Sequence, residues 1–317
     1  MMKMKDFGFY RGIDLGGWFS QCDYSDERLD GFITEADLDR IASWGLDHVR
    51  IPVDYNVMES DSGVYIPKGF ERIGRALERC RARGLKAVLD LHKTYGFSFD
   101  AGEKEDGFFT SPACQERFMK LWEEMAGQFC DPENVAFELL NEVTDAGYIS
   151  VWNRVAAECI ARIRRIAPKT LILVGSYWNN SPEAVKDLDA PADDRVVYNF
   201  HCYSPLPFTH QGASWVPELN NDVRLSFEEA KFGTADFEKT FAPAIEHAEK
   251  NRTCLYCGEY GVIQSAAPED TVKWYRTIHE VFEKHEIARA AWTYKQMHFG
   301  ISDPRLDGVR DELIQYL

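Results

Sequence analysis

The chain of 317 residues lacks any run of about 18 apolar residues, so the sequence predicts no transmembrane helix. Basic residues are too few to balance the acidic ones: 36 Lys and Arg stand against 52 Asp and Glu, for a formal charge of −16. Partners that expose phosphate groups are bound through basic patches, which this composition disfavours. We therefore expect neither a nucleic acid nor a membrane as a partner.

Segments typical of linkers, disorder and secretion are also missing. No stretch is rich in Gly, Ser or Pro, and the composition is 45% hydrophobic and 13% aromatic, enough to fill a large core. We expect one domain over residues 1–317, and a monomer. The first residues, MMKMKDFGFYRG, contain no apolar segment of the kind that a secretory signal needs. A cytoplasmic location is expected, unless a signal has been removed.

The eight cysteines form no recognisable disulfide or zinc pattern. Cys254 and Cys257 make a C-x-x-C within an expected strand, but no second pair completes a four-ligand zinc site. Cys80 and Cys159 fall on the apolar faces of expected helices, where a thiol acts as a small hydrophobic group. We expect reduced structural thiols, no metal and no cofactor.

What the sequence does contain is a regular alternation of short apolar runs with amphipathic segments. The runs have the length and composition of strands, and they recur at intervals of about 40 residues, the length of one strand-and-helix unit. Eight such runs are found, at residues 8–14, 47–53, 85–92, 135–141, 170–175, 195–201, 253–259 and 288–294.

The segments between these runs are expected to be helices. Thr34 begins one of them, with Asp37 three residues later in the spacing of a capping box. Apolar residues recur at helical spacing over 70–80, 118–125 and 152–166. Eight strand–helix units with nearly continuous apolar strands favour an α/β fold, a single (β/α)8 TIM barrel. A doubly wound sheet is the alternative, but no G-x-G-x-x-G follows the first strand.

In a barrel of this kind the active site lies at the carboxyl ends of the strands, and six of the eight expected strands bring a polar or aromatic residue there. These residues are Arg50 on the second strand, His92 on the third, Asn141 and Glu142 on the fourth, His201 and then Tyr203 on the sixth, Glu259 on the seventh, and Trp292 on the eighth. One Arg or His at a strand end is more often a structural group than a catalyst. Six that converge on one face are hard to explain by structure alone.

The two carboxylates Glu142 and Glu259 would face each other across the barrel mouth. Glycoside hydrolysis requires such a pair, one to protonate the leaving oxygen and one to attack or to activate water. Arg50 and a tyrosine can hold one carboxylate ionised, and Asn141 can bond to a sugar 2-hydroxyl. Glu138 lies deeper on the same strand, and we interpret it as a buried structural charge that needs a partner.

At these residues the sequence resembles glycoside hydrolase family 5, the cellulase family A enzymes. The surrounding segments agree in order along nearly the whole chain: RGIDLGGWF, VRIPV, LDLH, FELLNE, GEYG and AWTYK. The stretch PLPFTHQGASW (205–215) also resembles a strand-six loop of bacterial members. The resemblance implies retention of configuration on a β-linked substrate, with Glu142 as general acid/base and Glu259 as nucleophile. Asp14 stands where many relatives carry Asn, and we expect only a local effect on loop hydrogen bonding.

Two other functions stay open. A metal-dependent hydrolase on the same barrel would use His92 and His201 as ligands, although such sites usually gather more His and Asp than reach this rim. It would lose activity in EDTA. A non-catalytic carbohydrate-binding barrel would bind oligosaccharides without forming product, although such a protein has no need for both glutamates.

The sequence also leaves the substrate open. The resemblance favours β-glucan chains or oligosaccharides, with β-mannan, β-xylan and exo-β-1,3-glucan specificity as alternatives. Four aromatic residues are either sugar-stacking platforms on the rim or loop anchors: Phe97, Trp178, Phe208 and Trp215. The segment 95–112 is expected to wall one end of the cleft, which would favour short oligosaccharides or chain ends.

Overall fold

Eight strands, each parallel to its neighbours in chain order, close into a barrel in the computed structural model, which describes residues 3–100, 107–220 and 222–317. The last strand pairs with the first through Arg11–Arg289, Gly12–Ala290 and Ile13–Ala291. The strands are β1 (Arg11–Asp14), β2 (His48–Asp54), β3 (Lys86–Lys93), β4 (Val135–Glu138), β5 (Ile172–Val174), β6 (Val196–Cys202), β7 (Leu255–Tyr260) and β8 (Ala288–Ala291). The predicted (β/α)8 barrel is confirmed, and all eight predicted runs contain a strand.

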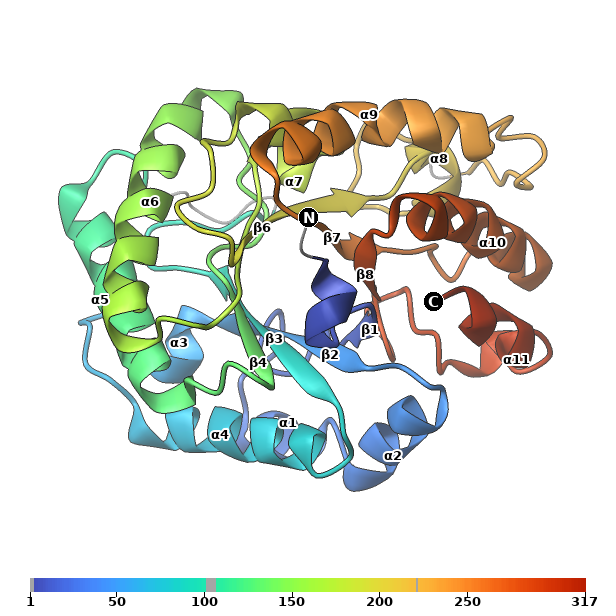
Figure 1. Cartoon of the computed structure of the whole chain (residues 1–317). Helices are drawn as coiled ribbons and strands as arrows, with labels where there is room; N and C mark the ends of the chain where they lie inside the picture. Colours follow the sequence, from blue (N-terminus) through green and yellow to red (C-terminus); the bar gives the residue numbers. More distant parts are fainter. Residues whose placement is uncertain (1–2, 101–106, 221) are drawn as a thin grey trace.

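Helices surround this barrel (Figure 1), and they bury the outer faces of the strands. Every residue of β2 is buried, as expected for a strand covered on both faces. The longer helices are α2 (Glu35–Ser43), α4 (Pro67–Arg81), α5 (Pro112–Phe129), α6 (Ile149–Ile166), α9 (Thr234–Asn251) and α10 (Pro268–His285). Shorter ones are α1 (Asp26–Gly31), α3 (Tyr55–Met58), α8 (Leu206–Thr209) and α11 (Arg310–Leu313), with 3-10 turns η2 (Ala146–Tyr148), η4 (Pro304–Leu306) and η5 (Ile314–Tyr316).

The predicted capping box is present at the start of α2. The Thr34 hydroxyl accepts a hydrogen bond from the backbone N–H of Asp37, and the Asp37 carboxylate accepts one from the backbone N–H of Thr34. These two contacts satisfy amide groups that have no partner inside the helix, so the helix begins where the sequence indicates.

The connection between β5 and β6 departs from the expected pattern of strand and helix. It contains only the turn α7 (Tyr177–Asn180) and the 3-10 helix η3 (Pro182–Asp187), in place of a long amphipathic helix. Pro182, the first residue of η3, cannot continue a helix from α7, and Pro191 follows η3, so no longer helix forms. As a result the residues that follow β5 stay near the barrel mouth, a point that matters for the site.

One end of the barrel is closed by the N-terminal segment. The 3-10 helix η1 (Met4–Phe7) lies across this end in Figure 1. Met4 and Phe9 pack with inward side chains from the strands, among them Leu171, Leu173 and Tyr256. The other end, where the strands finish, is the mouth.

All eight cysteines are free thiols, as the sequence predicts, and Cys130 is the exposed one among them. Five of the others are buried side chains in helices or strands. Over the described residues, no helix combines the length and apolar character needed to cross a membrane. The cytoplasmic location and the monomeric state stay predictions.

Candidate active site

A cavity of about 800 Å³ opens at the barrel mouth. Six of the eight predicted site residues line it: His92, Glu142, His201, Tyr203, Glu259 and Trp292. The two others are buried: Arg50 donates to Glu259 in the cavity lining, and Asn141 accepts from Arg50. The structure therefore brings all eight together.

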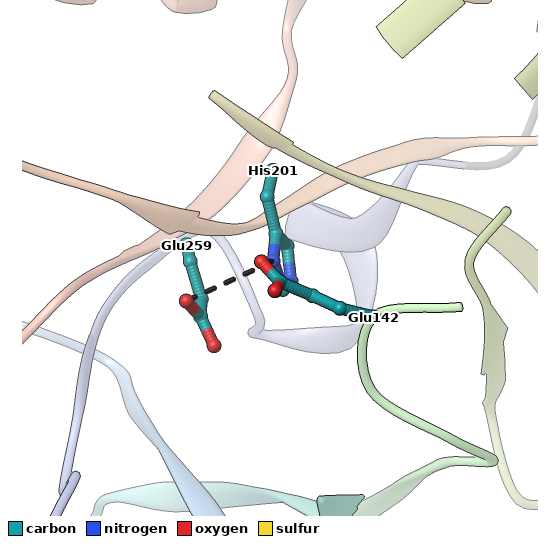
Figure 2. Close-up of side chains that lie close together, drawn as sticks. All are labelled: Glu142, His201 and Glu259. Carbon is teal, nitrogen blue, oxygen red and sulfur yellow. Dashed lines mark hydrogen bonds and ion pairs between the residues drawn. The ribbon is translucent and has the colours of Figure 1, made fainter. Parts of the chain in front are cut away.

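Figure 2 shows the side chains of Glu142, His201 and Glu259 converging at this mouth. One carboxylate oxygen of each glutamate and one imidazole nitrogen lie within 4.8 Å of one another. Retaining glycosidases hold their two carboxyl groups about 5–5.5 Å apart, while inverting ones leave about 6.5–9.5 Å for a water molecule. This close approach of the two glutamates fits the retaining arrangement.

Glu142 follows the end of β4 and is held by two donors. His201 Nδ1 lies 2.8 Å from Glu142 Oε1, and Asn179 Nδ2 donates to Glu142 Oε2 at 2.9 Å. Its side chain is 12% exposed. Burial raises the pKa of this carboxyl group to about 7, against the opposing effect of the Asn179 hydrogen bond. A carboxylic acid that keeps its proton near neutral pH is suited to general acid catalysis.

Glu259, near the end of β7, has a different environment. Arg50 Nη1 donates to its Oε1 at 2.8 Å, and the Tyr203 hydroxyl donates to its Oε2 at 2.9 Å. A guanidinium and a phenol together stabilise negative charge on this carboxylate. Two carboxyl groups in such unequal surroundings can take opposite roles in acid–base chemistry.

Arg50 lies in the middle of β2, not at its end as the sequence reading placed it, because the strand continues to Asp54. Its guanidinium contacts four carboxylates: Asp14 at 2.9 Å, Asp90 at 3.0 Å, Glu138 at 2.7 Å and Glu259 at 2.8 Å. Glu138 binds it through both oxygens and also accepts from Asn199 at 2.8 Å. Arg50 is thus the partner that Glu138 requires.

The prediction for Asp14 was wrong. This residue is the last of β1, fully buried, and its Oδ1 accepts from the same Arg50 nitrogen, Nη1, that binds Glu259. Burial raises the pKa of Asp14 well above its usual value. Asp14 therefore belongs to the charged centre of the barrel, because it stands beside Arg50 in the register of β1 and β2.

Three further residues complete the base of the cavity. The Asn141 Oδ1 accepts from Arg50 at 2.8 Å, and its Nδ2 is buried without a partner among the described residues. His92 Nδ1 lies 2.6 Å from Asp90 Oδ2, and burial raises the pKa of Asp90 to about 7. The ring of His92 is parallel to that of Trp292, with centroids 5.9 Å apart. Asn141 thus keeps an amide donor without a protein partner in the described part of the chain, and His92 lies parallel to the indole.

The four aromatic residues left open by the sequence divide into two pairs. Trp178 and Trp215 line the cavity and are 55% and 44% exposed. Phe97 and Phe208 are buried and anchor their loops. Within the segment 95–112, Phe99 and Asp100 line the cavity, whereas residues 101–106 lie outside the described part.

The two predicted metal ligands do not form a common cluster in the described residues. The group that could hold a cation consists of Glu142, His201 and Glu259, without His92. Its atoms already bind each other and their neighbours, as in the His201–Glu142 and Tyr203–Glu259 hydrogen bonds. The donor set is therefore arranged for proton transfer, and the metal-dependent alternative gains no support from it.

We expect Arg50→Ala to lower both activity and stability. The four carboxylates around the guanidinium would lose their counter-charge inside the barrel, at a cost of roughly 3–5 kcal/mol in the free energy of unfolding. Denaturant unfolding measures this loss. Arg75→Ala is the matched control, because Arg75 is 53% exposed and its ion pairs should contribute less than about 1 kcal/mol. Unfolding at the same denaturant concentration in the Arg50 variant would contradict this account of the cluster.

Two glutamates at this spacing, at the carboxyl ends of strands in a (β/α)8 barrel, define a class of protein, the retaining glycoside hydrolases. The chain belongs to the cellulase family, glycosyl hydrolase family 5, and the model of that family matches residues 11–298.

Similar proteins agree with this family. The chain is 55% identical to cellodextrinase A of Ruminococcus flavefaciens over 287 residues, which cover 90% of this chain and 85% of that one. It is 37% identical to endoglucanase C of Acetivibrio thermocellus over 98% of both chains. A solved structure of Thermotoga maritima Cel5A with mannotriose is 25% identical, with a TM-score of 0.82 over 99% of both chains.

Proposed function

We propose that this enzyme hydrolyses cellodextrins, short chains of β-1,4-linked glucose, with Glu142 as general acid/base and Glu259 as nucleophile. The observation that carries the proposal is the pair of carboxyl groups with unequal environments: burial raises the pKa of Glu142 to about 7, while Glu259 accepts hydrogen bonds from Arg50 and Tyr203. The substrate class is supported by the 55% identity to a protein named cellodextrinase.

In the first step, a Glu259 oxygen attacks the anomeric carbon while Glu142 gives its proton to the glycosidic oxygen. The carbon–oxygen bond to the leaving saccharide breaks, and a covalent glycosyl–enzyme ester forms. Arg50 and Tyr203 hold Glu259 in place and shield its charge from the acid across the cleft. The free Nδ2 of Asn141 is placed to donate to the 2-hydroxyl of the reacting sugar, a contact that strengthens in the transition state.

In the second step, Glu142 acts as a carboxylate. It takes a proton from a water molecule whose oxygen attacks the anomeric carbon, and the ester bond to Glu259 breaks. The released sugar has the configuration of the substrate, and both glutamates return to their starting protonation states.

The walls of the cavity support a preference for short chains. Trp178 and Trp215 offer exposed indoles on which further sugars can stack. At the side of β1 and β3, Gln21 Nε2 donates to Asp100 Oδ1 at 2.9 Å, and Lys93 Nζ lies 2.5 Å from Asp100 Oδ2. The Gln21–Asp100 contact joins the loops after β1 and β3, and both residues form part of the cavity wall.

The proposal is tested by the products formed from cello-, laminari-, manno- and xylo-oligosaccharides of equal length. We expect the cello series to give the highest kcat/KM, with little further gain beyond the length that fills the cavity, and activity unchanged by EDTA. A manno, xylo or laminari series cleaved faster would overturn the substrate assignment. Binding of oligosaccharides without product, measured by calorimetry, would instead favour the carbohydrate-binding alternative.

A further inference from the structure

The turn after β5 has an unusual backbone. Trp178, Asn179 and Asn180 have φ values of 50°, 55° and 56°, all in the left-handed region. Asparagine enters this region more readily than most residues, while a bulky residue such as tryptophan does so rarely. Three such residues in succession persist only where the surroundings hold them, and this kind of strain concentrates at functional sites.

Two backbone hydrogen bonds hold the turn against the segment that carries Glu142. The N–H of Trp178 donates to the carbonyl of Thr144 at 3.2 Å, and the N–H of Asn179 donates to the carbonyl of Val143 at 3.0 Å. The turn therefore moves together with the loop that follows β4. The two asparagine side chains of the turn are therefore held in a fixed position relative to the Glu142 carboxyl group.

The first asparagine binds Glu142 directly. Asn179 Nδ2 donates to Glu142 Oε2 at 2.9 Å, and His201 Nδ1 lies 2.8 Å from the other oxygen. Both oxygens of the carboxyl group are thus occupied by fixed nitrogen atoms. An amide donor stabilises the carboxylate form over the acid, because the hydrogen bond is stronger to a charged oxygen.

The second asparagine acts on His201. Burial lowers the pKa of this imidazole to about 4, so the ring is neutral and one nitrogen carries its proton. Nδ1 lies 2.8 Å from Glu142 Oε1 and 3.7 Å from Glu259 Oε2, and it is the donor to Glu142 when that carboxyl group is ionised. Nε2 must then accept, and Asn180 Nδ2 lies 3.3 Å from it.

The neighbours of these side chains leave them little freedom. Asn180 is fully buried against Gly175, where an added Cβ would stand 2.2 Å from the Asn180 Oδ1. A Cβ on Gly258 would stand 3.0 Å from the His201 Nε2. Two glycines thus make the space in which the amide and the imidazole meet.

We propose that Asn179 and Asn180 are positioning residues for the acid/base glutamate, the first by binding its carboxyl group and the second by fixing the tautomer of His201. This inference rests on the proposed role of Glu142. In this proposal the left-handed turn holds the Glu142 carboxyl group so that it can both donate and accept a proton.

Several other charged or titratable groups act on Glu142 and stay unchanged when the asparagines are replaced. They come from five strands or their loops: Arg50, Asp90, Asp100, Glu138, Tyr203, His201 and Glu259. A shift that follows the loss of Asn179 alone is therefore attributable to its hydrogen bond.

The test is Asn179→Gly, because glycine adopts the left-handed backbone without strain and only the amide is lost. The alkaline limb of the kcat/KM profile, on a substrate with a poor leaving group, reports the pKa of the acid in the free enzyme. Without the Asn179 donor the acid form is favoured, so this limb should move up by about 0.5–1 pH unit. A merely structural role would lower activity at every pH and leave the limb in place, and that result, or a downward shift, would overturn the inference.

Arg252→Gly is the matched control, since Arg252 is also left-handed, with φ of 56°, but ends α9 away from the mouth. It should leave the profile unchanged. Carbon-13 NMR of Glu142 supplies a second readout. If the carboxyl titration moves in Asn179→Gly while the activity limb does not, the failure lies with the acid/base role and not with the contact.

The tautomer is tested separately by nitrogen-15 NMR of His201 in the unaltered enzyme. We expect the proton on Nδ1 and none on Nε2 at neutral pH. A proton on Nε2 would show that this nitrogen does not accept from the Asn180 amide. Asn180 would then not be a positioning residue.

Discussion

Replacement of Glu259 by glutamine is expected to abolish hydrolysis while leaving the fold intact. The amide has nearly the shape of the carboxylate and can still accept from Arg50, but it carries no negative charge with which to attack the anomeric carbon. Removal of a catalytic nucleophile reduces kcat by a factor on the order of 10⁴ or more. Release of reducing sugar from cello-oligosaccharides measures the loss.

The fold of this variant is checked by its far-UV circular dichroism and melting temperature. Glu116→Gln is a suitable control, because Glu116 is a half-buried residue of α5 that pairs with Arg162 and does not line the cavity. It should keep full activity. A Glu259→Gln enzyme within tenfold of the unaltered rate would show that another group is the nucleophile.

Glu142→Ala should have an effect that depends on the leaving group. A natural cello-oligosaccharide needs a proton on the departing oxygen, so its cleavage should slow by about 10²–10⁴-fold. An activated aryl β-cellobioside departs as a stable phenolate and needs little protonation. Its first step, seen as a burst of released phenol, should be far less affected.

The second step of the Glu142→Ala enzyme lacks the base that activates water. Azide is a small anion that attacks the glycosyl–enzyme without such help, so it should restore turnover of the aryl substrate and yield a β-glycosyl azide. Azide should do nothing for the unaltered enzyme. Equal losses on both substrate types, with no response to azide, would contradict the assignment of Glu142 as acid/base.

The barrel was predictable because its strands are buried on both faces and therefore read as short apolar runs. The ends of those runs also located the site, since parallel strands in a barrel finish at one rim. Glu142, His201 and Glu259 meet at that rim because each stands within four residues of the end of its strand. Their catalytic roles stay predictions until the variants are measured.

Other features depended on information that a strand pattern does not carry. Arg50 lies below the rim because β2 runs four residues past it, and Asp14 joins it through the register of β1 and β2. Asn179 and Asn180 reach the site through a left-handed turn, and the spacing of apolar residues in the sequence does not predict such a turn. The aromatic pairs could not be separated either, because the conformation of each loop decides which side chains are covered, as where Phe97 packs against Phe109, and Trp178 stays exposed.

Four buried carboxyl groups in and below the barrel mouth take up protons when the chain folds. Burial raises the pKa of Asp14, Asp90, Glu138 and Glu142, two of them to about 7, whereas in the unfolded chain each lies near 4. Between about pH 4 and pH 7 these groups hold protons in the folded barrel that they release in the unfolded chain. The contribution of these four groups to stability is complete below about pH 4 and is lost as the pH rises through 7. His92 and His201 have the opposite dependence, because burial lowers their pKa values to about 4, so their contribution is complete above about pH 6.5 and is lost as the pH falls toward 4. The carboxyl group that keeps a proton ready for the glycosidic oxygen thus favours the folded state in mild acid, whereas the imidazoles beside it favour the folded state at neutral pH.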